Sequence, residues 1–138
     1  MKFRFFINEE KGTVAVKAID PLEEYYREFL QFYHKYKMDP DYTLFEAFIG
    51  AYSDQINKIV GVASCNREEG DEFNLDFGKE LARQRYMKTF ESFRINMYAM
   101  ILGKLDATIG AVVKRLNFSC TRRAERENII ADMTARAE

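Results

Sequence analysis

The chain has 138 residues, of which 47% are apolar and 31% are charged, a balance that suits one domain with a sizeable core and excludes intrinsic disorder. No run of 18 uncharged apolar residues is present, and acidic residues stand where a signal peptide needs its apolar region. We therefore expect a cytoplasmic protein that does not enter a membrane. The net charge of −1 excludes a uniformly basic nucleic-acid coat protein.

Residues 1–19 have the pattern of a β-hairpin. Two short runs rich in β-branched and aromatic residues, 2–7 and 13–19, are joined by a turn that contains Gly12. Val14 and Val16 alternate with less apolar residues in the second run. This alternation predicts a sheet with one face on a core.

Residues 20–57 predict two helices that form a helical hairpin. Asp20-Pro21 and Asp39-Pro40 are helix-start signals, because Asp caps free amides and Pro at the first helical position has no amide to satisfy. Glu23 would complete a capping box with Asp20. Apolar residues recur every three or four positions in both segments, as one buried helix face requires.

Residues 58–77 predict a strand followed by a charged loop. The run between Lys58 and Ser64 is apolar and β-branched, which favours a strand near 58–65. Gly61 inside it indicates a bulge or the close approach of another backbone. After an acidic loop, Asn74 is a candidate helix cap that places Asp76 in the first helical turn.

The pattern over residues 78–138 predicts long helices. Taken with the preceding segments, we expect the whole chain, 1–138, to form one α+β domain with a small antiparallel sheet, an αα-hairpin and the long C-terminal helices. Gly103 and Gly110 permit a kink or break, and we expect the main segment to end at 117–120, before a polar helical tail. The apolar stripe is longer than a small sheet can cover, which favours a homodimer or a higher homo-oligomer formed through this segment.

Catalytic and metal-binding patterns are missing from the sequence. His34 is the only histidine, and Cys65 and Cys120 are far apart, without the spacing of metal ligands. We interpret both cysteines as reduced, buried or half-buried residues. The acidic stretch 68–72 does not match a calcium loop. We expect a non-enzyme with no metal and no cofactor.

The basic residues point instead to recognition of an anion. Between Lys79 and Arg123 there are ten Lys or Arg and three acids, an excess of +7. Arginine forks bind phosphate, aromatic faces stack on bases, and an asparagine can bond a base edge. Each aromatic residue taken singly is favoured for the core, because Tyr86 and Phe93 lie on the apolar stripe of the helix. For the arginine cluster, ligand binding is favoured over simple solvation. The candidate ligand-binding residues are Arg83, Tyr86, Arg94, Asn96, Lys114, Arg115, Arg122 and Arg123.

A family resemblance narrows this class. The segment GVASCNREEGDEFNLDFGKELARQRYMK, with Ala63-x-Cys65, Asp71-x-Phe73 and Gly78-x-x-Leu81-Ala82-x-x-Arg85, together with Lys11-Gly12-Thr13-Val14, resembles small phage proteins of Firmicute type. Among these the chain is similar to the phage Thoeris anti-defence sponge proteins. These have an antiparallel sheet followed by two long helices, form dimers and higher assemblies, and sequester cyclic ADP-ribose signals. The helices predicted over residues 20–56 look like an insertion in that pattern.

The resemblance implies a pocket at a dimer interface. In this sequence Tyr86 and Asn96 would hold the base, and Lys114, Arg115, Arg122 and Arg123 would contact phosphates. The leading hypothesis is therefore a phage anti-defence protein that binds a cyclic nucleotide-like immune signal without turnover in an infected bacterial host. The alternative is a phage protein that binds nucleic acid or inhibits a host protein through the same basic helical face.

Overall fold

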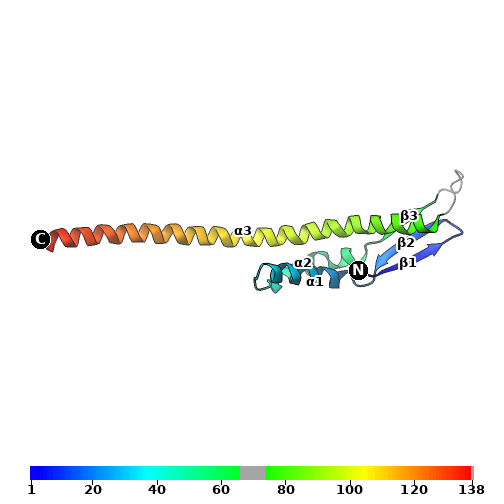
Figure 1. Ribbon diagram of the computed structural model, residues 1–138, viewed down its shortest axis with the longest axis horizontal. Coiled ribbons are helices and arrows are strands. Elements are labelled where there is room, and N and C mark those ends of the chain that lie inside the picture. Colours follow the sequence, from blue (N-terminus) through cyan, green and yellow to red (C-terminus); the bar gives the residue numbers. More distant parts are fainter. Residues whose placement is uncertain (66–73, 138) are drawn as a thin grey trace. The chain divides into compact units, whose positions relative to one another are not determined.

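The computed structural model describes residues 1–65 and 74–137 and has an α+β fold, as the sequence predicts (Figure 1). The residues divide into two compact units, Met1–Met100 and Ile101–Glu138, and each is described by itself. In chain order the elements are β1 (Phe3–Asn8), β2 (Thr13–Ala18), α1 (Pro21–Lys35), α2 (Tyr42–Asn57), β3 (Gly61–Ser64) and α3 (Leu75–Ala137).

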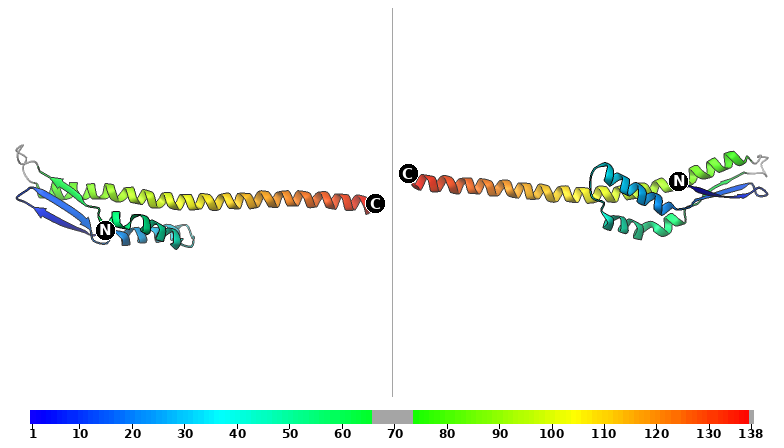
Figure 2. Two further views of the ribbon diagram at one scale, coloured as in Figure 1. Left: turned by 180° about the vertical axis from the view of Figure 1, so that it is seen from behind. Right: turned by 60° about the horizontal axis from the view of Figure 1, so that its bottom comes forward.

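The three strands form one antiparallel sheet in the order β1-β2-β3 (Figure 2). Val16 pairs with Phe5 on one side and with Gly61 on the other, and Val14 is likewise flanked. Both valines are fully buried, whereas Phe6, on the opposite face of β1, is 51% exposed. The predicted hairpin with one face on the core is confirmed, and Gly12 closes its turn with a φ of 65°.

The inner face of the sheet packs on the first turns of α3 at unusually short range. A Cβ built on Gly61 would overlap the carbonyl oxygen of Ala82 and lie 2.7 Å from the Tyr86 amide nitrogen. The guanidinium of Arg85 donates a hydrogen bond to the Val62 carbonyl oxygen, at 2.7 Å. The predicted close backbone approach at Gly61 is therefore confirmed, because β3 lies directly against the α3 backbone.

The helix starts agree only in part with their sequence signals. Asn74 caps α3 by accepting a hydrogen bond from the Phe77 amide at 3.0 Å, as predicted. The second helix begins two residues later than its Asp-Pro signal, and Asp41 is its cap, accepting from the Leu44 amide at 3.1 Å. Pro21 occupies the first turn of α1 as predicted, but Asp20 makes no side-chain cap bond there, so the capping-box prediction is wrong.

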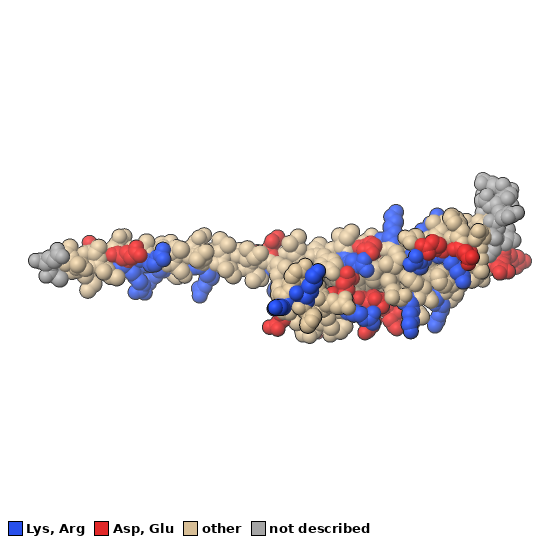
Figure 3. All heavy atoms as spheres, in the orientation of Figure 1, with Lys and Arg blue, Asp and Glu red and all other residues tan. Residues whose placement is uncertain are grey.

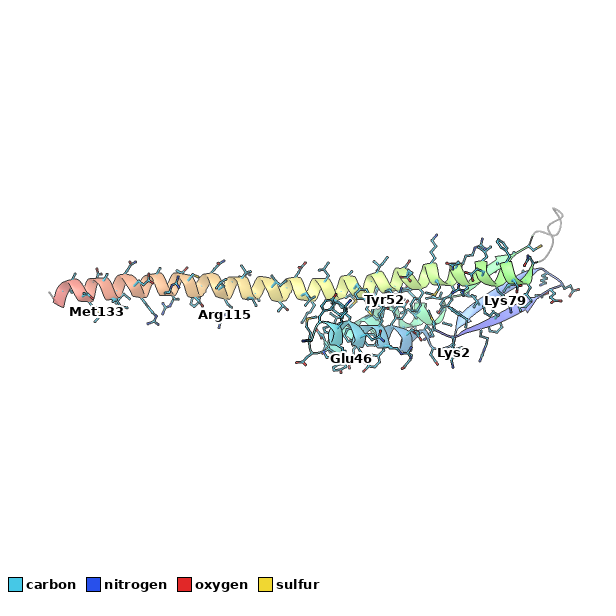
Figure 4. The ribbon with its side chains drawn as sticks, in the orientation of Figure 1. Lys2, Glu46, Tyr52, Lys79, Arg115 and Met133 are labelled. Carbon is cyan, nitrogen blue, oxygen red and sulfur yellow. The ribbon has the colours of Figure 1, made fainter. Side chains whose placement is uncertain are left out.

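Aromatic side chains form the centre of the first unit, where α1 and α2 lie side by side and meet α3 (Figures 1 and 2). Tyr25 is fully buried, and its ring stacks on Phe90 of α3 at 4.2 Å and meets Phe48 of α2 edge-on at 5.5 Å. Its hydroxyl donates to the Phe90 carbonyl oxygen at 2.7 Å. Tyr52, labelled in Figure 4, contacts Phe93 of α3 with ring centroids 5.6 Å apart. Contacts between aromatic rings thus hold the αα-hairpin against α3.

The third helix is uninterrupted from Leu75 to Ala137, so the predicted end at 117–120 and the separate C-terminal helix are wrong. Apart from the adjacent backbone of the helix itself, nothing lies within 4 Å of a Cβ built on Gly103 or Gly110, and each glycine costs only about 1 kcal/mol in a helix interior. The Thr121 hydroxyl donates to the Asn117 carbonyl oxygen at 3.1 Å, within the predicted break. The polar sequence there therefore joins two parts of one helix.

Candidate anion-binding site

Of the eight candidate residues, Arg83, Tyr86, Arg94 and Asn96 lie on the part of α3 that belongs to the first unit. Tyr86 is only 1% exposed, and its ring meets Phe3 edge-on at 5.5 Å. Burial raises the pKa of its phenol. The structure thus places Tyr86 in the core under the sheet, so its ring has no open face on which a base can stack in this chain.

Asn96 is half-buried and follows Tyr86 by ten residues on the same helix. Ten residues correspond to about 15 Å along a helix axis. A stacking residue and a base-edge donor must both touch one base, which spans less than that distance. The pair that the resemblance implies for the base is therefore not brought together within one chain.

Arg94 is bound within a polar network on the side of the aromatic core. Its guanidinium forms ion pairs with Glu28 of α1, at 2.9 Å, and with Glu91 of its own helix, and lies 5.3 Å from the centre of the Phe90 ring. The Tyr98 hydroxyl donates to the other carboxylate oxygen of Glu28 at 3.2 Å. Arg94 thus has a structural role that the sequence did not reveal, since Glu28 is 66 residues away.

A pocket of about 250 Å³ opens beside this network. It is lined by Glu24, Glu28, Arg27 and Arg94, together with Met1, Gln31 and Phe90. Two acids face two arginines there, and Arg27 is paired with Glu24 at 2.9 Å. The balanced charge gives the pocket no net attraction for a phosphate.

The Glu28 network predicts a loss of stability in alkali. Burial first, and then the Glu28 carboxylate, raise the pKa of Tyr98 to about 12, against about 10 in an unfolded chain. The neutral phenol is therefore favoured in the folded state. Its stabilising contribution is complete below about pH 10 and is lost as the pH rises from about 10 to 12. Tyr25 adds to this trend, because burial raises its pKa as well.

We expect the free energy of unfolding, measured with urea, to fall over that pH range and to fall less steeply in Tyr98→Phe. Tyr42→Phe serves as the control because Tyr42 is 53% exposed. If the free energy of unfolding declined equally steeply in wild type and Tyr98→Phe, ionisation of Tyr98 would not be the cause.

Arg83 is partly exposed and is held by its own helix. Its guanidinium donates two hydrogen bonds to Glu80, at 3.0 and 2.7 Å. These bonds raise the pKa of Arg83 and lower that of Glu80. The pair sits in water, where such a bridge contributes little to stability and can open.

The other four candidates, Lys114, Arg115, Arg122 and Arg123, lie in the second unit. All four are exposed, and Figure 4 shows side chains extending outward around this part of α3, with Arg115 labelled. Residues 107–124 contain these four cations and no acid. Within the described part of the chain, no carboxylate forms an ion pair with Lys114 or Arg115. Arg122 and Arg123 form only wide, exposed bridges, to Glu125 at 3.3 Å and Glu127 at 3.8 Å.

The helix geometry lines up part of this basic segment. Arg115 and Arg122 are seven residues apart, which places them on one face with about 10 Å between them along the axis. Arg126 follows four residues later on the same face, just beyond the end of the window counted in the sequence. Arg126 could have been added to the candidates from the sequence, because spacings of seven and four residues place side chains on the same helix face. Figure 3 shows basic and acidic side chains intermixed over the first unit, and on the rest of the helix it shows basic groups with an acidic patch beside them toward the C-terminal end.

The remaining residues considered for catalysis or metal binding are a histidine, two cysteines and an acidic stretch. His34 is exposed on α1. Cys65 is half-buried and Cys120 is exposed, and neither is in a disulfide, so the expectation of a covered Cys120 is wrong. The acidic stretch 68–72 lies outside the described residues. Over residues 1–65 and 74–137 no three His, Cys, Asp or Glu side chains gather as metal ligands.

None of the described helices contains a stretch long and apolar enough to cross a membrane. Comparison of the chain with known protein families, with curated proteins and with solved structures gives no match.

Proposed function

We propose that this chain binds a phosphate-bearing, nucleotide-derived small molecule of the cyclic ADP-ribose type and retains it without turnover. The observation that carries the proposal is the acid-free segment 107–124, in which four exposed cations have either no ion-pair partner among the described residues or only weak ones. Unpaired guanidinium and ammonium groups lose little on binding an anion, since no strong internal ion pair has to be broken. In this role the protein acts as a phage anti-defence protein in the cytoplasm of an infected bacterium.

A second copy of the chain belongs to this proposal. The described residues of one chain form no enclosed pocket around Lys114 or Arg115, because nearly every side chain from 102 to 136 is exposed. Tight retention of a small ligand requires a concave site that buries most of its surface. Two copies of the basic segment, placed side by side, supply a second wall next to Arg115 and Arg122, which flank the apolar stripe, and twice the charge.

The direct test of this function is retention. The full chain is incubated with cyclic ADP-ribose, filtered to remove free ligand, and heated to release what it holds. We expect intact cyclic ADP-ribose in the released fraction. A released hydrolysis product would contradict binding without turnover, and an empty protein fraction would contradict the proposed ligand.

The basic segment is tested by removing two charges. Lys114→Gln/Arg115→Gln is expected to weaken binding at least tenfold, because a hydrogen bond to a charged group contributes about 1.5–3 kcal/mol. Lys58→Gln/Lys88→Gln removes the same charge at two exposed positions elsewhere and is the matched control. Isothermal titration with cyclic ADP-ribose measures both variants. An equal loss in both would show that net charge, and not this segment, governs binding.

Nucleic-acid binding is the second candidate, and the exposure of the basic side chains favours it. Arg115, Arg122 and Arg126 follow one line on an open helix face, which suits an extended phosphate backbone. Salt separates the two functions. Binding to a single-stranded oligonucleotide should weaken with a log–log slope of about −0.7 for each phosphate contacted, whereas a closed small-ligand site responds far less.

A further inference from the structure

The second unit has large apolar side chains that nothing in the described chain covers. Leu102, Ile109, Val112 and Leu116 are each 60–61% exposed, and Ile130 and Met133 are 62% and 65% exposed. Most helices in proteins owe their stability to packing of an apolar face, and isolated helices are marginal in water. A helix with this many exposed apolar residues therefore needs a partner.

The spacing of these residues defines what the partner must be. Leu102, Leu105, Ile109, Val112 and Leu116 are separated alternately by three and four residues, and the same alternation reaches Ile130 and Met133. This is a heptad repeat, in which the first and fourth positions, a and d, form the contact seam of a left-handed coiled coil. A seam of this kind fits another helix with the same repeat. We propose that a second copy of this chain pairs with the seam as a parallel, in-register, two-stranded coiled coil.

The arginines of the seam select the parallel orientation. Between Leu116 and Ile130 the seam positions are Ser119, Arg123 and Arg126. In a parallel, in-register pair each arginine faces its own copy, so like charges meet in two adjacent layers, but the five layers from 102 to 116 stay wholly apolar. In the antiparallel pair that overlaps the same residues, Arg123 would face Val112 and Arg126 would face Ile109. Four layers would then contain arginine.

The flanking charges select the same orientation. In a parallel pair, position g of one helix faces position e five residues further along the other. Here Arg122 is at g and Glu127 is at e, so each chain offers an attractive pair to the other. The antiparallel overlap instead places Arg115 of one copy beside Arg122 of the second copy, which is repulsive. The bridges inside one helix are exposed and wide, so Arg122 and Glu127 can exchange partners at little cost.

Arginine in the seam also favours two strands over three or four. In a dimer the long stem of Arg126 can lie over the neighbouring Ile130 layer while its guanidinium reaches water. In larger bundles the a and d positions are more deeply buried, and the charge would lose that water. The inference takes up the second copy that the proposed function includes, but it depends on self-association alone and requires no ligand.

Sedimentation equilibrium of the full chain tests the interface. We expect wild type to be a dimer at micromolar concentration and Ile109→Asp to dissociate at least tenfold more readily. Phe118→Asp is the matched control, because Phe118 is 61% exposed and Ile109 is 60% exposed, yet Phe118 lies off the seam. Circular dichroism of the first unit's aromatic core shows that each variant is folded. A monomeric wild type, or equal weakening in both variants, would overturn the proposal.

Disulfide trapping tests the orientation. With Cys65 and Cys120 replaced by serine, Val112→Cys should form a homodimeric disulfide on mild oxidation, because position d faces itself only in the parallel pair. In the antiparallel pair Val112→Cys would cross-link only when mixed with Arg123→Cys, and that result would overturn the parallel arrangement. A wild-type dimer that retains no cyclic ADP-ribose would contradict the proposed function and leave this inference intact.

Discussion

Replacing Gly61 with alanine is expected to lower the free energy of unfolding by about 3 kcal/mol or more, at the upper end of what overpacking a core costs. The added methyl group would overlap the Ala82 carbonyl oxygen and lie 3.0 Å from its carbonyl carbon. Both are backbone atoms of α3, so no side chain can rotate away. Relief requires β3 to move off the helix, which also breaks the bond from Arg85 to the Val62 carbonyl.

Urea unfolding followed by circular dichroism measures this effect, and Gly50→Ala is the matched control. Gly50 lies inside α2, and apart from the adjacent helix backbone nothing is within 4 Å of a Cβ built there. Alanine in an exposed helix interior is better than glycine by up to about 1 kcal/mol, so this variant should be slightly more stable than wild type. Unfolding midpoints that agree between Gly61→Ala and wild type would show that β3 does not pack on α3 as described.

The local features of this fold could be predicted from sequence because their signals are local. The hairpin follows from the alternation at Val14 and Val16 and from the glycine turn. The roles of Asn74 and Gly61 could be predicted because a helix cap and a close backbone contact each require a particular residue type. The error at 117–120 has the opposite cause. Polar residues there satisfy the sequence criteria for a helix end, but the helix runs through them, and the Thr121 hydroxyl bonds to the Asn117 carbonyl oxygen of the preceding turn.

The candidate site was harder to predict because it depends on contacts between distant residues. Tyr86 has the same apolar spacing whether it lines a pocket or a core, and the sheet that covers it comes from the other end of the chain. Arg94 counts as one unit of positive charge in the sequence, but Glu28 and Glu91 neutralise it. By contrast, Lys114 and Arg115 have no acid within seven residues before or after them, so their availability could be anticipated.

The division of roles between the two units follows from this distribution of charge. In the first unit the arginines at 27, 83 and 94 each pair with a glutamate, and the interior is aromatic. That unit is therefore built to be stable. In the second unit the apolar and basic side chains are both exposed, which is unfavourable for an isolated chain and suited to a binding surface. Substitutions in the first unit should change stability, and those in the second should change association.

Replacing Tyr25 with alanine is expected to cost about 3–5 kcal/mol, the range for large-to-small changes in a core. This ring joins three helices: it belongs to α1, stacks on Phe90 of α3 and meets Phe48 of α2. Its removal leaves a cavity among fully buried rings that are too rigid to collapse into it. Thermal and urea unfolding, followed by the near-ultraviolet circular dichroism of the aromatic side chains, measures the loss of unfolding free energy.

Two further variants separate the ring from its hydroxyl. Tyr25→Phe keeps the stacking and removes only the bond to the Phe90 carbonyl oxygen, so it should cost about 1 kcal/mol. Tyr36→Ala is the control, because Tyr36 lies just after the same helix and is 56% exposed, and it should cost less than about 0.5 kcal/mol. If Tyr25→Ala were as mild as Tyr36→Ala, the αα-hairpin would not be fastened to α3 by this ring. If Tyr25→Phe were as severe as Tyr25→Ala, the hydroxyl bond, and not the ring packing, would hold the three helices together.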